Sequence, residues 1–175
     1  MGATMSRADE ARSIAQQLIP DHHPHLRAAE ILYVFTDQRR KRCDRVRLGS
    51  AAKLSSLQRF LASGQDGVEE GPDFVILIDV GLWQDMPKEQ RVALIDHELC
   101  HCALFVRRKI DGWRGWYRWT PDMDPPREVE ETRWGMRGHD IEEFGEVLYR
   151  HGFWKPDSPE RKFGEIVAMQ LKLQG

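Results

Sequence analysis

The sequence predicts an α+β domain in which a small β-sheet packs on one long amphipathic helix. β-branched and aromatic residues at 31–36 (ILYVFT) indicate a buried strand, and the unbroken apolar run at 74–79 (FVILID) indicates a strand buried on both faces. From about 88 to 107, apolar residues recur at spacings of three and four, as on one face of a helix. The 175 residues suffice for one such domain with an ordinary core.

The elements before the second strand follow from periodicity and from turn residues. Apolar residues at the helical period predict a helix at 6–19, which we expect Pro20 to end. A basic turn within 38–50 leads into a further strand that begins near Val46. Apolar positions on one side predict a helix at 51–62, and the polar, glycine-rich segment 63–72 is typical of a loop.

The later elements are less regular. The long helix begins near Pro87. Residues 111–137 contain four tryptophans and read as a hairpin or flap, while helices are predicted at 139–150 and 159–173. We therefore expect three parts: an N-terminal helix at 1–20, a central domain at 21–155 and a C-terminal helix at 156–175.

Composition excludes several classes of protein. The formal net charge of −2 gives no overall attraction to nucleic acid or to an anionic membrane. The three cysteines are an odd number, and Cys100 and Cys102 lie in a predicted helix, where we expect them to be small buried hydrophobes. The N-terminus lacks a signal-peptide core, and no apolar run could span a bilayer. We expect a cytoplasmic, intracellular protein.

The chemistry-bearing motif is HExxH, formed by His97, Glu98 and His101 on the long helix. Histidines four apart lie on one helical face, so both imidazoles can bind one zinc ion. Glu98 lies beside that ion, where it can take a proton from zinc-activated water and deliver it to the leaving amine. The alternative is a pair of histidines that merely pack on a helix surface.

A catalytic zinc ion needs a third protein ligand and an open position. The downstream candidates are His139, Glu142, Glu143 and His151. A histidine that follows a glycine at the start of a helix can point into a cleft, which favours His139. Glu142 or Glu143 stays open as an alternative, because helical periodicity does not separate them from His139.

Other polar residues could support the ligands. Carboxylates that could accept hydrogen bonds from ligand imidazoles are Asp96, Asp140, Glu142 and Glu143. Tyr117 and Tyr149 are candidates to stabilise an oxyanion. The clustered histidines His22, His23 and His25 we expect at the surface.

These pieces resemble the phage metallopeptidase family, which is related to the SprT-like, Spartan-type metallopeptidases. The resemblance rests on ILYVFT, VRLGSA, DFVILID, QRVALIDHELCHC and HDIEEF…YRHGFW, which extend from about residue 20 to 155. It implies a zincin-like fold, a phage or prophage origin, and one zinc ion per chain held by His97, His101 and His139. It also implies peptide-bond hydrolysis with Glu98 as general base, on a peptide or protein substrate. The chain has a longer insert between His101 and His139 than Spartan-type proteins and lacks their zinc ribbon.

A second class of function competes with catalysis. The chain could be a non-catalytic zinc-stabilised module that binds nucleic acid or a host protein. Its basic run could contact phosphates, although a solvated hairpin tip is the plainer interpretation. The residues of this run are Arg39, Arg40, Lys41, Arg42, Arg45 and Arg47.

Overall fold

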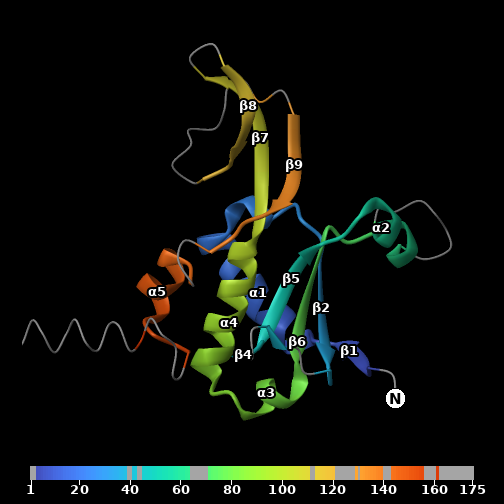
Figure 1. Ribbon diagram of the computed structural model, residues 1–175, viewed down its shortest axis with the longest axis vertical. Helices are drawn as coiled ribbons and strands as arrows, with labels where there is room; N and C mark the ends of the chain where they lie inside the picture. The colour runs from blue at the N-terminus through green and yellow to red at the C-terminus, as the bar shows by residue number, and fades with distance from the viewer. Residues whose placement is uncertain are drawn as a thin grey trace, which may run out of the picture.

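A four-stranded sheet and two long helices form the body of the molecule in the computed structural model (Figure 1). The strand order is β1 (Met5–Arg7), β2 (Ile31–Thr36), β6 (Phe74–Asp79) and β5 (Gly49–Lys53). Strands β2 and β6 are parallel, and the two edge strands are antiparallel to their neighbours. The structure describes residues 3–38, 41–42, 45–63, 71–110, 113–120, 129, 131–139, 143–155 and 161.

The core lies between one face of this sheet and the helices α1 (Asp9–His22) and α4 (Lys88–His101). Alternate residues of β6 point to that face, and Phe74, Ile76 and Ile78 are fully buried there. Val75 and Leu77 point the other way and are only half-buried. The prediction of an α+β fold and of both buried strands is therefore confirmed, but β6 is fully buried on one face alone.

The N-terminal helix differs from its prediction at both ends. Residues 5–7 form strand β1, and α1 continues through Pro20 to His22. A proline removes one backbone donor, but the last turn is still fastened, because the His23 N–H donates to the Ile19 carbonyl. The connector that follows is a 3-10 turn, η1 (Pro24–Leu26).

The region after β2 was predicted only in outline. The basic run forms a short hairpin, β3 (Lys41–Arg42) and β4 (Arg45–Val46), in which the side chains at 39–46 lie outside the described residues. Residues 51–53 belong to β5 and pair with β6, so the predicted helix at 51–62 starts too early.

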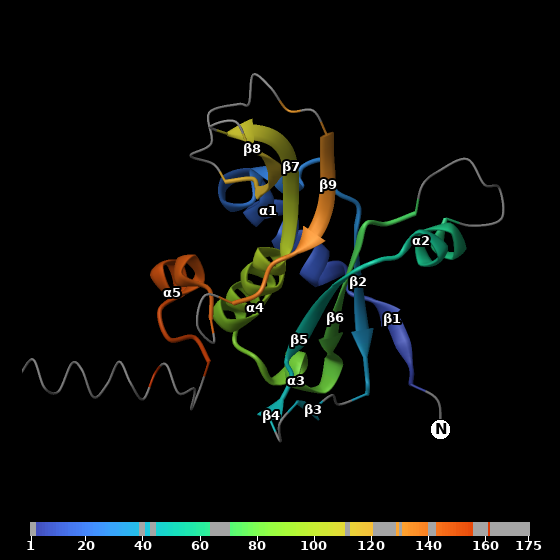
Figure 2. The same cartoon turned by 45° about the horizontal axis from the view of Figure 1, so that its top comes forward.

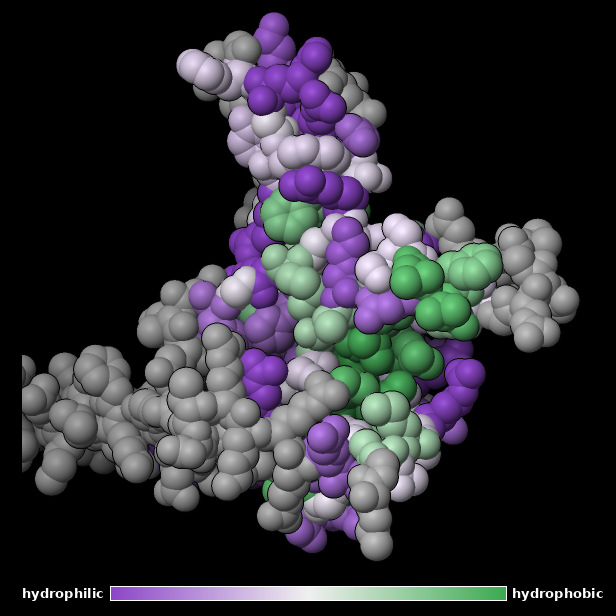
Figure 3. All heavy atoms as spheres, turned by 45° about the vertical axis from the view of Figure 1, so that its right-hand side comes forward, coloured by the Kyte–Doolittle hydropathy of each residue, from purple (hydrophilic) through white to green (hydrophobic). Residues whose placement is uncertain are grey.

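Helix α2 (Ser56–Ala62) begins where a capping box forms between Ser55 and Gln58. Its apolar residues Leu57, Phe60 and Leu61 are exposed rather than packed in the core. Figure 3 shows hydrophobic side chains gathered over α2 and the adjoining sheet face.

Helix α4 ends at His101, and the chain passes directly into a second sheet. This sheet has the order β8 (Trp113–Arg118), β7 (Cys102–Ile110), β9 (Glu131–Met136) and projects from the body (Figure 1). The prediction of a helix to about residue 107 is therefore wrong. Residues four apart, such as Cys102 and Val106, share a face in a strand as they do in a helix, so the apolar stripe could not separate the two.

Two short helices complete the described structure. Helix α3 (Val80–Asp85) is capped by the Asp79 carboxylate, which accepts from the Leu82 N–H. Helix α5 (Gly145–His151) packs beside α4 (Figure 2). The predicted helix at 139–150 thus begins later than expected, and His139 lies in the segment after β9. Within the described residues, none of the helices combines the length and apolar composition of a bilayer-spanning segment.

The proposed division at residues 20 and 155 stays a prediction. Helix α1 runs past residue 20. The predicted C-terminal helix lies outside the described residues except for Arg161.

Candidate metal centre

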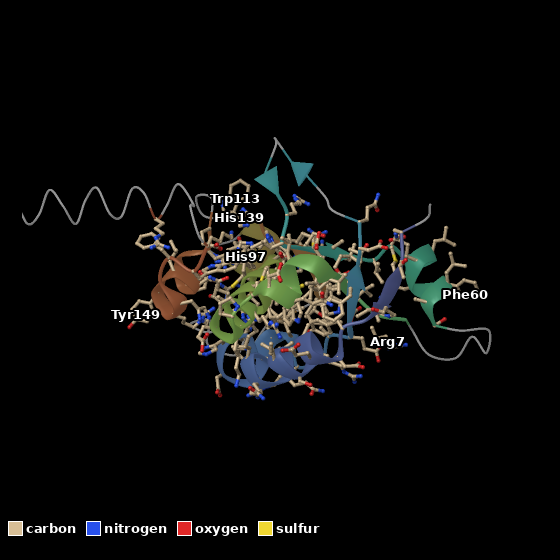
Figure 4. All side chains as sticks on the ribbon, turned by 90° about the horizontal axis from the view of Figure 1, so that it is seen from below. Arg7, Phe60, His97, Trp113, His139 and Tyr149 are labelled. Carbon is tan, nitrogen blue, oxygen red and sulfur yellow. The ribbon has the colours of Figure 1, made fainter. Side chains whose placement is uncertain are left out.

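Three histidine side chains converge on one point. His97 and His101 come from α4, one turn apart, and His139 comes from the segment after β9. Candidate ligand atoms of the three lie within 4.8 Å of one another, and the Nε2 atoms of His97 and His139 are 3.1 Å apart. Figure 4 shows His97 and His139 on the side of α4 that faces away from α1.

The second sheet explains how His139 reaches α4. Strand β7 leaves the end of α4, and β9 returns antiparallel to it, pairing Met136 with Cys102. The ladder continues one residue further, where the Arg137 N–H donates to the His101 carbonyl at 2.8 Å. His139 is two residues beyond this bond, so the hairpin itself brings the third imidazole to the other two.

The hydrogen bonds of the ligand rings suit a metal ion. His101 Nδ1 lies 2.8 Å from the Arg137 carbonyl, which can only accept, so this nitrogen carries the proton and Nε2 has the free lone pair. His97 Nδ1 is likewise bonded to the Glu143 carboxylate. Two nitrogens bound tetrahedrally to one zinc ion are about 3.3 Å apart, close to the 3.1 Å between His97 and His139.

Burial keeps two of these rings neutral. It lowers the pKa of His97 to about 4, although the hydrogen bond to Glu143 opposes this shift. Burial also lowers the pKa of His101. A neutral imidazole is the form that binds a metal, so both rings are ready to act as ligands at neutral pH.

Glu98 follows the ligand His97 on α4 and lies against the edge strand β5. Its side chain is buried, its carboxylate accepts from the backbone N–H of Ala51, and burial raises its pKa to about 8. Its Oε2 atom has no hydrogen-bond partner among the described residues. The approach to β5 is close: a Cβ on Gly49 would lie 2.7 Å from Glu98 Oε1. Such a carboxyl group can take up and release a proton.

Glu143 is the described carboxylate that contacts a candidate ligand. It is buried, bonds His97 Nδ1, and accepts from Lys155 Nζ at 2.8 Å. Burial alone would raise the pKa of Glu143, but the bonds to His97 and Lys155 outweigh burial and lower this pKa to about 2. Lys155 was missed by sequence reasoning, because no local pattern links it to the motif. Asp140 and Glu142 lie outside the described residues.

Asp96 was expected to accept a hydrogen bond from a ligand imidazole, but its described partners are other residues. Its fully buried carboxylate accepts from His23, from Arg150 and from His151, all at 2.7 Å. Burial would raise the pKa of Asp96, but the hydrogen bonds and charges of His23 and Arg150 hold it well below its usual range. The Asp96 carboxylate thus links the middle of α4 by hydrogen bonds to the connector after α1 and to helix α5. His23 was expected at the surface but is buried in this network.

Candidate ligand atoms of His23, Asp96 and Cys100 also lie within 4.8 Å of one another. The guanidinium of Arg150, which donates twice to Asp96, places a positive charge at this spot. We therefore interpret the group as an ion network rather than a metal site. Cys100 and Cys102 are buried, as predicted, and burial raises the pKa of both thiols.

The two tyrosines considered for oxyanion stabilisation lie on different elements. Tyr149 on α5 is 92% exposed and points away from the histidines (Figure 4). Tyr117 on β8 packs under the guanidinium of Arg108. Neither has a described contact with the three imidazoles.

Comparison with known proteins identifies a family. The model of a family described as "Putative phage metallopeptidase" matches residues 3–162, which is most of the chain. No curated protein and no solved structure matches the chain.

Proposed function

The chain belongs to the phage metallopeptidase family, and from this membership and the site geometry we propose that it is a zinc-dependent peptidase. The observation that carries the proposal is the convergence of His97, His101 and His139, two of which come from the helix that also carries the buried Glu98. In this proposal each chain holds one zinc ion, and its substrate is a peptide or protein. We also propose that the fold is zincin-like. The relationship to SprT-like peptidases stays a prediction.

The three imidazoles fit the ion that this chemistry needs. When bound, zinc would polarise the scissile carbonyl and lower the pKa of a water molecule. His97 and His101 supply neutral Nε2 atoms, since their Nδ1 atoms are engaged by Glu143 and by the Arg137 carbonyl. Three protein ligands leave a position of the tetrahedron for water or substrate.

Glu98 carries the proton in this mechanism. Its carboxylate accepts a proton from the attacking water and later delivers it to the leaving amine. Burial against β5 supports both roles, because it raises the pKa of Glu98 toward the working pH and fixes the direction of the carboxylate. Glu143 and Lys155 hold the His97 ring in its orientation.

The test replaces the proton carrier and leaves the ligands in place. We expect Glu98→Gln to abolish hydrolysis of fluorescein-labelled casein while zinc content stays that of the wild type. Glu89→Gln, at the other end of α4, is the control and should keep full activity. Full activity in Glu98→Gln would rule out this mechanism. Zinc binding by the wild type without hydrolysis of any peptide would favour the non-catalytic binding module instead.

A further inference from the structure

One face of the β8–β7–β9 sheet concentrates positive charge. Residues directly opposite one another point to the same face, so Arg107 of β7 shares its face with Trp116 of β8 and Glu131 of β9. Side chains alternate between the two faces along each strand, so the other residues of this face follow from these three. We call this face the basic face. Its described charges are the cations of Arg107, Lys109, Arg114, Arg118 and Arg133, and the carboxylate of Glu131. Glu131 forms an ion pair with Arg107 at 3.3 Å.

The opposite face of the sheet packs on the body. Cys102 and Val106 are buried on it, Trp134 contacts Phe74 of β6, and the Cys102 carbonyl is bonded to His25. The basic face therefore points away from these contacts. Because the whole chain has a formal net charge of −2, these cations are a local feature. Figure 3 shows strongly hydrophilic residues at the far end of the projecting sheet.

The basic face leads to the candidate metal centre. The ligand His101 directly precedes β7, and His139 follows β9 by three residues. At a rise of about 3.3 Å per residue, Arg118, opposite Phe105, lies about 13 Å along the strand from His101, and Arg114, opposite Lys109, about 26 Å. An extended polypeptide cleaved at the histidines would therefore place residues about four to eight positions away beside these cations.

The aromatic side chains of this face favour carboxylates over nucleotide bases as ligands. Arg133 lies over the Trp116 ring at 4.1 Å from its centroid and over Phe105 at 5.9 Å. The guanidinium thus competes with a base for a stacking position on Trp116. A stacked guanidinium still presents N–H groups at its edge, in the fork that matches a carboxylate.

We propose that the basic face binds an acidic segment of a polypeptide substrate, about four to eight residues from the bond cleaved at the histidine centre. The inference rests on the proposed peptidase function. It assigns substrate selection to the projecting sheet and bond cleavage to α4. Lys109, Arg118 and Arg133 select for carboxylates, because an extended acidic segment can pair with several of them at once.

The first test measures selectivity. Fluorogenic peptides share a randomised centre and carry four Glu, four Ser or four Lys residues, placed five to eight positions from that centre on either side. We expect kcat/KM to be about tenfold higher for Glu than for Ser flanks, since three exposed ion pairs each contribute roughly a factor of two. The preference should vanish in Lys109→Gln/Arg118→Gln/Arg133→Gln and persist in the matched control Arg7→Gln/Arg12→Gln/Lys88→Gln.

Equal kcat/KM for the three flanks in the wild type would overturn the inference and leave the proposed function standing.

The second test separates binding from catalysis. Glu98→Gln protein is titrated into a labelled Glu-rich peptide and into a labelled oligothymidylate, and fluorescence anisotropy is recorded. Tighter binding of the Glu-rich peptide, lost with the triple substitution, supports the inference even if no peptide is cleaved, in which case the proposed function fails by itself. Tighter binding of the oligothymidylate through the same three residues would overturn the inference in favour of nucleic acid, and so would absence of binding to either probe.

Discussion

The Nδ1 atom of His97 is hydrogen-bonded to the carboxylate of Glu143, which lies 46 positions later in the chain. Glu143 is bonded in turn to Lys155, so a row of three side chains, two buried and the third half-buried, runs from α4 to the segment after α5. A carboxylate on the far nitrogen fixes the ring orientation and makes the imidazole a stronger ligand. This relationship predicts how the site responds when the carboxylate is changed.

Replacement of Glu143 should weaken metal binding without unfolding the protein. We expect Glu143→Gln to raise the Kd for zinc roughly 10- to 100-fold, because His97 loses its charged partner. Competition with a chelating dye measures the Kd. Glu89→Gln is the control on the same helix, and an unchanged Kd in Glu143→Gln would show that the contact does not tune the ligand.

Gly49 leaves room for the Glu98 carboxylate. In Gly49→Ala the new Cβ would lie 2.7 Å from Glu98 Oε1, so the carboxylate must move. We expect kcat/KM to fall about 100-fold with zinc content unchanged, since a displacement of about 1 Å has this effect on a catalytic group. Gly81→Ala is the matched control, because its Cβ would make only an ordinary contact with Asp79. Wild-type activity in Gly49→Ala would contradict the placement of Glu98.

The ion network around Asp96 should stabilise the fold at neutral pH. Removing the charge in Asp96→Asn leaves Arg150 without its buried partner, and we expect a loss of about 3 kcal/mol in the free energy of unfolding at pH 7. The folded-state pKa of Asp96 is below its unfolded value, so this contribution is present above about pH 4 and is lost as the pH falls further.

Urea unfolding at pH 7, 5 and 3, in the presence of a chelator, measures this difference. The gap between wild type and Asp96→Asn should narrow at pH 3. The exposed Asp21→Asn serves as control. A gap that is constant with pH would mean that the side chain stabilises by packing alone.

The exposed helix α2 should tolerate changes that α4 does not. Phe60 is 65% exposed, whereas Leu99 is fully buried. We expect Leu99→Ala to lower the free energy of unfolding by about 3 kcal/mol and Phe60→Ala to change it by less than about 1 kcal/mol. Chemical denaturation compares the two variants, and similar losses would show that α2 is packed in solution.

Local sequence patterns predicted the elements whose residues fit only one type of secondary structure. The strands at 31–36 and 74–79 combine β-branched residues with short length, and both have the predicted bounds. The stripe from Val92 to Val106 fits a helix and, in its last part, a strand equally well. The residues from Cys102 onward form a strand because β7 pairs with both β8 and β9. Because this pairing joins residues that are far apart in sequence, a local pattern does not reveal it.

The residues of the candidate site also fall into those that local patterns predict and those that only the tertiary structure brings together. The HExxH spacing brings His97 and His101 onto one helical face by local geometry alone. Lys155, and the partners of Asp96, enter through tertiary packing of α5 and of the connector after α1, which no periodicity records. Buried polar groups need partners, so the observation that could have pointed to such a network is a charged residue, Asp96, within the buried stretch of α4.

The most direct test of the central claim is the zinc content of purified protein, measured by elemental analysis. We predict about one zinc ion per chain in the wild type, in Glu98→Gln and in Glu142→Ala, and loss of the ion in His139→Ala. His22→Ala, which removes an exposed histidine, controls for nonspecific binding. A wild-type protein that stays free of zinc after reconstitution, or a His139→Ala variant that retains it, would contradict the three-histidine centre.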